Sequence, residues 1–220
     1  MLFNSFEFLV FLPIVFLLYW FAFKKLRAQN LFVVVASYLF YGWWDWRFLI
    51  LIAFTTLCSY ASGILLERQE GHRHIQRLIS IANIVLNLTI LGIFKYFNFF
   101  SENLQHLFQW FGFELDWVTL DILLPVGISF YTFQALSYTI DIYRHKMKPT
   151  HDIVAFFAFI SFFPQLVAGP IERATNLLPQ FESQRTFDYT AAVDGMRQIL
   201  WGLFKKIVVA DTCLSLIHIS

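Results

Sequence analysis

Four polar side chains recur at helical spacing in the segment 123–144, whose sequence is LLPVGISFYTFQALSYTIDIYR. They are Tyr131, Gln134, Tyr138 and Asp141, and on an α-helix their positions fall within roughly 80° of one another. A carboxylate, an amide and two phenols on one stripe of an apolar helix can line a polar cavity that orients a substrate. They can equally hold neighbouring helices together by hydrogen bonds. The residues alone leave both interpretations open.

The composition indicates a membrane protein. Of the 220 residues, 58% are hydrophobic, 20% aromatic and only 14% charged, with a mean hydropathy of +0.61. A soluble domain has about 45–50% apolar and about 25% charged residues. The net charge of +1 gives no basic field that would suggest nucleic acid. The two cysteines, Cys58 and Cys213, make no disulfide framework.

Apolar stretches predict an all-α, polytopic transmembrane helical bundle with short or re-entrant helices. We expect the first stretch to be a retained span, because it lacks the basic start and the cleavage site of a signal peptide. Two stretches, 31–44 and 153–168, are shorter than the ~20 residues of a straight crossing. The predicted spans are 6–23, 31–44, 48–66, 78–100, 121–143 and 153–168, followed by an amphipathic helix near 191–210.

The loops carry an orientation signal. Nine of the sixteen Lys and Arg residues fall in three loops, 24–30, 67–77 and 144–148, whereas the loop 101–121 has four acidic residues and no basic one. Cytoplasmic loops carry an excess of Lys and Arg. The pattern therefore predicts that these three loops face the cytoplasm and that the N-terminus is extracytoplasmic.

No catalytic constellation or metal site is evident among the remaining polar residues. His72 and His74 form an HxH pattern without a third ligand nearby, and none of the six histidines lies in a predicted span as a shielded base. Lys95 lies late in the fourth predicted span, and we expect its long side chain to reach the headgroups. Nucleophile-elbow, Walker-loop and HExxH motifs are absent from the sequence.

A second informative stretch is the segment 162–181, FFPQLVAGPIERATNLLPQF. Its prolines and a glycine are expected to break any continuous helix, and irregular backbone at membrane depth needs shielding by protein or a water-filled cavity. Glu172 and Arg173 could form an exposed interfacial pair or contribute to the polar lining of a funnel. The helix-breaking residues are Pro164, Gly169, Pro170 and Pro179.

These two stretches together resemble the membrane-bound O-acyltransferase family, in its bacterial alginate O-acetyltransferase branch. Two further segments are similar to the same branch: ASYLFYGWWDWRFLIL at 36–51 and GLFKKIVVADT at 202–212. The resemblance runs in order as far as Thr212. It implies the N-terminal half of a fold in which transmembrane helices ring a thin centre, where funnels from both faces meet at a histidine.

The resemblance also implies an activity. Members move an acyl group, usually acetyl, from a cytoplasmic donor such as acetyl-coenzyme A or an acylated carrier to hydroxyls of an extracytoplasmic polysaccharide such as alginate. The group often passes through an extracytoplasmic relay partner protein, in the bacterial inner membrane and without a bound cofactor. Within the family, D-alanyl transfer to teichoic acid is an alternative.

Five residues are carried over from the resemblance as substrate-tunnel candidates: Gln134, Tyr138, Asp141, Gln165 and Arg173. The family histidine is expected beyond residue 220, so no catalytic residue is carried over. We therefore expect 1–213 to be a partial transmembrane domain that is inactive by itself. The segment 214–220, LSLIHIS, reads as a translated sequencing adapter and is expected to be an artefact.

Two other classes of protein remain open. A transporter or channel also has broken helices and polar residues inside the membrane, although no second copy of the broken segment occurs in these residues. A non-catalytic membrane scaffold of a polysaccharide export complex would need no cytoplasmic donor. A histidine in a late apolar helix of the full gene would favour acyl transfer over both.

Overall fold

The structure is a computed structural model that describes residues 3, 5–43, 45–110, 125, 127–166 and 169–213. These residues form helices joined by short connections, which confirms the predicted all-α membrane bundle. They divide into two compact units, one of residues 1–29 with 184–220 and one of residues 30–183. The predictions for 111–124 and for the proposed artefact at 214–220 lie outside the described residues.

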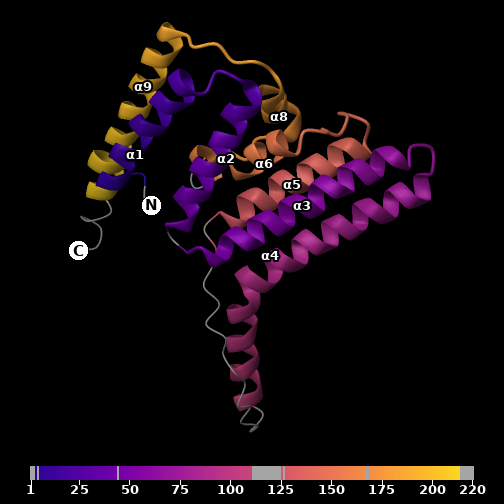
Figure 1. Cartoon of the computed structure of the whole chain (residues 1–220). Helices are drawn as coiled ribbons and strands as arrows, with labels where there is room; N and C mark the ends of the chain where they lie inside the picture. Colours follow the sequence, from indigo (N-terminus) through magenta and orange to yellow (C-terminus); the bar gives the residue numbers. More distant parts are fainter. Residues whose placement is uncertain are drawn as a thin grey trace. The chain divides into compact units, whose positions relative to one another are not determined.

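Three helices that lie side by side form the body of the larger unit (Figure 1): α3 (Arg47–Arg68), α4 (Arg73–Trp110) and α5 (Ile128–Tyr143). In two of them an apolar segment is long enough to cross a membrane. These segments are Arg47–Arg68, with a mean hydropathy of 2.0, and Arg73–Phe97, with 1.9. They agree with the predicted spans at 48–66 and 78–100.

The distribution of polar side chains on α4 is the reverse of that on a helix of a soluble protein. Its inward positions are polar: Gln76, Ser80, Asn83 and Asn87 are all buried. Its outward positions are apolar, since Leu78, Ile81, Val85 and Leu88 are all exposed. A helix in water buries its apolar stripe. In a membrane the outward face of a helix contacts lipid and is apolar, while the polar side chains face other helices. This pattern therefore indicates a membrane environment.

Helix α5 is the central helix of this unit, with ten of its sixteen residues buried. It contacts α3, α4, α6 (Ile153–Ser161) and α8 (Ala174–Glu182). It begins after Gly127, whose φ of 78° is in the left-handed region that glycine adopts without strain. The predicted span began at 121, but the helix begins at Ile128, and 121–124 lie outside the described residues.

The segment after α5 is broken, as predicted. α6 has nine residues, about 14 Å, which is too short to cross a bilayer. Phe162 has a non-helical backbone, and a single turn, α7 (Phe163–Leu166), precedes α8. The prediction that Pro179 breaks a helix is wrong, because Pro179 lies inside α8. Its missing N–H costs one backbone hydrogen bond, and its neighbours Leu178 and Phe181 are buried.

The prediction that 101–121 is a loop is also wrong for its first ten residues, since α4 continues to Trp110. No proline or glycine follows Gly92 before Trp110, so the segment holds no residue that would break the helix. Lys95 is exposed on this helix, with its Nζ 5.4 Å from the centre of the Tyr96 ring. Its predicted reach to the headgroups stays a prediction.

Helix α2 (Leu26–Gly42) replaces the predicted span at 31–44. Within the larger unit, Asn30 of α2 donates from Nδ2 to the Phe181 carbonyl of α8 at 2.7 Å. The smaller unit contains α1 (Phe6–Leu17), the π-helix η1 (Leu18–Ala22), α9 (Tyr189–Phe204) and the π-helix η2 (Lys205–Ala210). These bounds agree with the helices predicted at 6–23 and 191–210.

Candidate functional site

The predicted polar stripe is a buried stripe on the central helix. Tyr131, Gln134, Tyr138 and Asp141 all lie on α5, and their exposed fractions are 0%, 1%, 0% and 5%. Since the helix is surrounded by α3, α4, α6 and α8, the stripe faces protein instead of lipid. The two interpretations left open by the sequence can be separated by asking which of these polar atoms have partners.

Tyr138 has a structural role. Its Oη accepts a hydrogen bond from the Thr150 N–H at 3.3 Å, and its ring lies 4.5 Å from that of Phe156 in α6. On the α3 side it packs against Gly63, where a Cβ atom would lie 2.6 Å from the Tyr138 Oη. Tyr138 therefore fits the interpretation in which the stripe holds helices together.

The other three residues of the stripe do not fit that interpretation. Tyr131 Oη, Gln134 Oε1 and Asp141 Oδ2 are buried, and none of them has a hydrogen-bond partner in the described part of the chain. Each buried polar group without a partner costs about 1–3 kcal/mol of stability. Such groups in a native structure call for an explanation, of which a catalytic or binding role is one. These three atoms are candidates for contact with a substrate, and buried atoms without a partner also occur elsewhere in the described residues, among them Thr132 Oγ1 on the same helix and Tyr38 Oη on α2.

Gln165 lines a separate hollow of about 550 Å³ in the broken segment. Its side chain is 8% exposed and donates from Nε2 to the Pro170 carbonyl at 2.7 Å. The other residues that line this hollow are Phe162, Pro164, Gly169, Pro170, Glu172, Asn176, Leu177 and Gln180. The hollow is thus lined by amides, one carboxylate and apolar rings.

Arg173 is exposed at the start of α8 and is not part of the buried stripe. The predicted pair with Glu172 does not form in the described residues, because the Glu172 Oε2 instead accepts from Asn176 Nδ2 at 3.4 Å. The broken segment still reaches α5, since the N–H of Ala174 donates to Ser137 Oγ at 3.4 Å. That hydroxyl donates in turn to the Gln134 carbonyl at 2.8 Å.

A polar cluster that sequence reasoning missed joins α3, α4 and α5. Asn83 donates from Nδ2 to Thr139 Oγ1 at 2.7 Å, and its Oδ1 accepts from Asn87 Nδ2 at 3.1 Å and from Ser59 Oγ at 3.4 Å. All four side chains are buried. A signal was present, because Gln76, Ser80, Asn83 and Asn87 recur at helical spacing in an apolar stretch.

The described histidines lie outside the buried interior. His72, His74, His145 and His151 are all exposed, and His151 Nε2 lies 3.0 Å from Glu67 Oε2. Within the described ranges, no group of three His, Cys, Asp or Glu residues could hold a metal ion. None of these four imidazoles forms a hydrogen bond or ion pair with the α5 stripe within the described residues.

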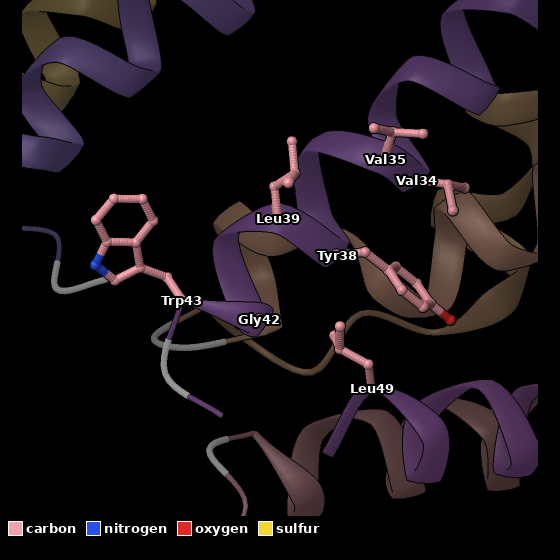
Figure 2. A pocket seen from close by; sticks show the side chains of 7 residues that line it. All are labelled: Val34, Val35, Tyr38, Leu39, Gly42, Trp43 and Leu49. Carbon is pink, nitrogen blue, oxygen red and sulfur yellow. The ribbon is translucent and has the colours of Figure 1, made fainter. Parts of the chain in front are cut away.

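Another hollow, of about 570 Å³, lies between α2 and the start of α3 (Figure 2). Figure 2 shows Leu49 of α3 below the ring of Tyr38, with Trp43 at the edge. Its polar groups are the Tyr38 hydroxyl, which is buried without a partner in the described residues, and the Trp43 indole nitrogen; the remaining lining side chains are apolar. The lining residues are Val34, Val35, Tyr38, Leu39, Gly42, Trp43 and Leu49.

Comparison with known proteins identifies relatives of this chain. The chain is 38% identical, over 98% of its length, to the probable alginate O-acetylase AlgI of Pseudomonas aeruginosa, and 38% identical, over 96%, to that of Azotobacter vinelandii. It is 31% identical, over 96%, to the peptidoglycan O-acetyltransferase of Helicobacter pylori. The chain is thus similar, over nearly its whole length, to proteins named alginate O-acetylase and peptidoglycan O-acetyltransferase.

The resemblance seen in the sequence is thereby confirmed. The chain spans about two fifths of the length of these relatives, 41%, 42% and 45% respectively. No family model matches the chain, and no solved structure matches it.

Proposed function

We propose that the chain forms part of a membrane-bound O-acyltransferase, which moves an acetyl group from a cytoplasmic donor to hydroxyls of an extracytoplasmic polysaccharide. The observation that carries the proposal is the 38% identity, over nearly the whole chain, to a protein named alginate O-acetylase. The unpartnered polar atoms on α5 support it, because a transfer reaction in a membrane needs polar groups at a shielded position.

In this proposal Tyr131, Gln134 and Asp141 line the substrate path and orient the reactants, with Gln165 farther along it. A phenol can donate a hydrogen bond to a carbonyl oxygen, and the unpartnered Gln134 Oε1 and Asp141 Oδ2 can each accept one from a hydroxyl. Holding two reactants in the right geometry contributes a large part of the rate enhancement of a two-substrate reaction. Tyr138 supports the path by packing, and Arg173 lies exposed at the start of α8.

The transfer itself needs a base. The acceptor hydroxyl oxygen attacks the acetyl carbon of a thioester, the carbon–sulfur bond breaks, and the hydroxyl proton passes through the base to the leaving thiolate. His72, His74, His145 and His151 are exposed, and no hydrogen bond or ion pair joins them to the stripe within the described residues. We therefore assign no catalytic residue to this chain and propose that the base comes from outside the described residues.

We propose that the basic loops face the cytoplasm of a bacterial inner membrane and that the N-terminus faces outward. In support, the α3–α4 and α5–α6 connections lie at the same end of the bundle (Figure 1), and residues of both, among them Glu70 and Lys148, line one small hollow of about 130 Å³. The donor, acetyl-coenzyme A or an acylated carrier, would approach this end. A relay partner and the polysaccharide would meet the opposite face.

We propose alginate or a similar polysaccharide as the acceptor. The relatives named alginate O-acetylase include matches at 36–38% identity, whereas the protein named peptidoglycan O-acetyltransferase matches at 31%. Peptidoglycan is therefore the second acceptor to test.

The test is complementation. The full gene that includes the coding sequence of this chain is expressed in a bacterium from which the alginate O-acetylase gene has been deleted, and the O-acetyl ester content of the secreted alginate is measured by NMR. We expect ester to return. A protein present in the inner membrane at the level of the native enzyme, with no ester on alginate or on peptidoglycan, would contradict the proposal.

A further inference from the structure

One exposed face of α4 carries two arginines above an apolar track. Arg73, Arg77, Ile81, Val85 and Leu88 follow one another at spacings of four, four, four and three residues, which keeps them within roughly 120° on the helix. The three apolar side chains are 45%, 55% and 45% exposed, and both arginines are exposed. We call this set the arginine-topped stripe.

The two guanidinium groups have no counter-ion in the structure. Neither Arg73 nor Arg77 forms an ion pair or a side-chain hydrogen bond within the described residues, and the first turn of α4 has no acidic residue. The carboxylates nearest in sequence are those of Glu67, which contacts His151, and of Glu70, which is exposed in the preceding turn.

An arginine at the other end of α3 has an acidic partner, unlike Arg73 and Arg77. Arg47 forms an ion pair with Asp45, with 2.7 Å between Nη2 and Oδ2. The hydrogen bond from Arg47 holds the pKa of the Asp45 carboxyl below its usual value. The local sequence thus provides a partner for Arg47 and none for the arginine-topped stripe.

Further cations lie at the same end of the bundle as Arg73 and Arg77. Lys148 lines the small hollow there together with Gln76 of α4, although the carboxylates of Glu67 and Glu70 line the same hollow. The chain segment that carries Lys148 has a high density of exposed positive charge: Arg144, Lys146 and Lys148. An anion at this end would meet an attractive field from several directions.

We propose that the arginine-topped stripe binds an anionic glycerophospholipid, with its phosphodiester on Arg73 and Arg77 and an acyl chain along Ile81, Val85 and Leu88. The planar fork of a guanidinium matches the geometry of phosphate oxygens. The apolar track runs directly from the arginines into the membrane-length segment Arg73–Phe97, where a soluble phosphate compound would have nothing to contact. The inference requires only that α4 is in a membrane and does not rest on the proposed enzymatic function.

The expected size of the effect follows from the charge. A Lys or Arg near an anionic lipid surface contributes about fivefold in affinity, the equivalent of about 1 kcal/mol. Removing both positive charges should therefore weaken binding about 25-fold. The preference should decline with added salt, because screening at 0.15 M ionic strength acts over about 8 Å.

The experiment is native mass spectrometry of the full chain in detergent, titrated with phosphatidylglycerol, phosphatidylcholine or glycerol 3-phosphate. We expect phosphatidylglycerol to bind more tightly than phosphatidylcholine, and the double variant with Arg73→Gln and Arg77→Gln to lose that preference. The matched control is Arg47→Gln, at the opposite end of α3, which should change phosphatidylglycerol affinity less than twofold.

Two further variants keep the outcome interpretable. Arg73→Lys with Arg77→Lys keeps the charge and should retain most of the preference, which excludes a general loss of structure. Ile81→Ser should weaken binding of the lipid without changing the binding of glycerol 3-phosphate. Equal binding of the two lipids to the unmodified chain, an unaffected double glutamine variant, or glycerol 3-phosphate binding as tightly as the lipid would each overturn the proposal.

Discussion

Replacing Gly63 by alanine tests the closest approach between α3 and α5. A Cβ atom at this position would lie 2.6 Å from Oη, 2.7 Å from Cε1 and 2.9 Å from Cζ of Tyr138. Real Cβ atoms do not approach so closely, so either the ring or the helix must move. The ring has little room to move, because Tyr138 is fully buried. Its ring contacts that of Phe156, and its hydroxyl accepts a hydrogen bond from the Thr150 N–H.

The expected loss of stability in Gly63→Ala can be compared with that in a matched glycine variant. Extra atoms in a well-packed interior cost about 1–3 kcal/mol. Any glycine-to-alanine change within a helix also gains up to about 1 kcal/mol of helix propensity. Gly92 of α4 has no atom within 4 Å of its Cβ position, so Gly92→Ala reports the propensity gain alone. We expect Gly63→Ala to be less stable than Gly92→Ala by about 1–3 kcal/mol.

The assay is reversible unfolding of the purified chain in mixed micelles, followed by far-ultraviolet circular dichroism. The same pair of glycine variants is then measured in a Tyr138→Leu background. There, Gly63→Ala should lose its cost, because the ring it meets is gone. Equal stability of Gly63→Ala and Gly92→Ala in the unmodified chain would refute the packing that we describe between α3 and α5.

Three other substitutions test the interior. Asn83→Ala should lower the free energy of unfolding by about 1–3 kcal/mol, because it leaves buried partners unpaired, whereas Asn103→Ala, which removes an exposed bond within α4, should change it little. Gly127→Ala should lower the free energy of unfolding more than Gly71→Ala does in the same assay. Both glycines have a positive φ, but only Gly127 has a backbone oxygen 2.8 Å from the position of an added Cβ atom. Asp141→Asn should leave thermal stability in detergent unchanged or higher, since an unpartnered buried carboxylate is replaced by a neutral amide; a fall in melting temperature would show that the carboxylate has a structural partner.

Much of the helical architecture could be predicted from the sequence, because length and hydropathy decide where a chain can cross a bilayer. The α5 stripe was also predictable, since helical periodicity alone places its four residues on one face. Their division into one structural residue and three unpartnered ones was not. That division depends on Gly63, Thr150 and Phe156, which lie far away in the sequence.

The errors have a common physical origin. Pro179 was predicted to break a helix, but tertiary burial of its neighbours outweighs one lost hydrogen bond. The buried polar face of α4 was not predicted, because the role of Asn83 and Asn87 depends on the side chains that they contact in the folded bundle. Whether Gln165 and Arg173 belong to a substrate path stays a prediction, since one is buried at a hollow and the other is exposed.

We propose that the unpartnered polar atoms on α5 serve acyl transfer and not stability. The most direct measurement is the O-acetyl ester content of alginate from the complemented deletion strain, comparing Gln134→Leu with Phe133→Leu. Gln134 lies in the buried stripe with Oε1 unpartnered, whereas the adjacent Phe133 is 44% exposed. Both variants should reach the membrane at normal levels, because removing an unsatisfied buried carbonyl does not destabilise.

We expect Gln134→Leu to lower the ester content at least tenfold, the equivalent of about 1.4 kcal/mol of lost transition-state stabilisation, and Phe133→Leu to leave it unchanged. Normal ester content in Gln134→Leu, at normal membrane levels, would contradict the claim and leave the stripe as a feature of helix packing.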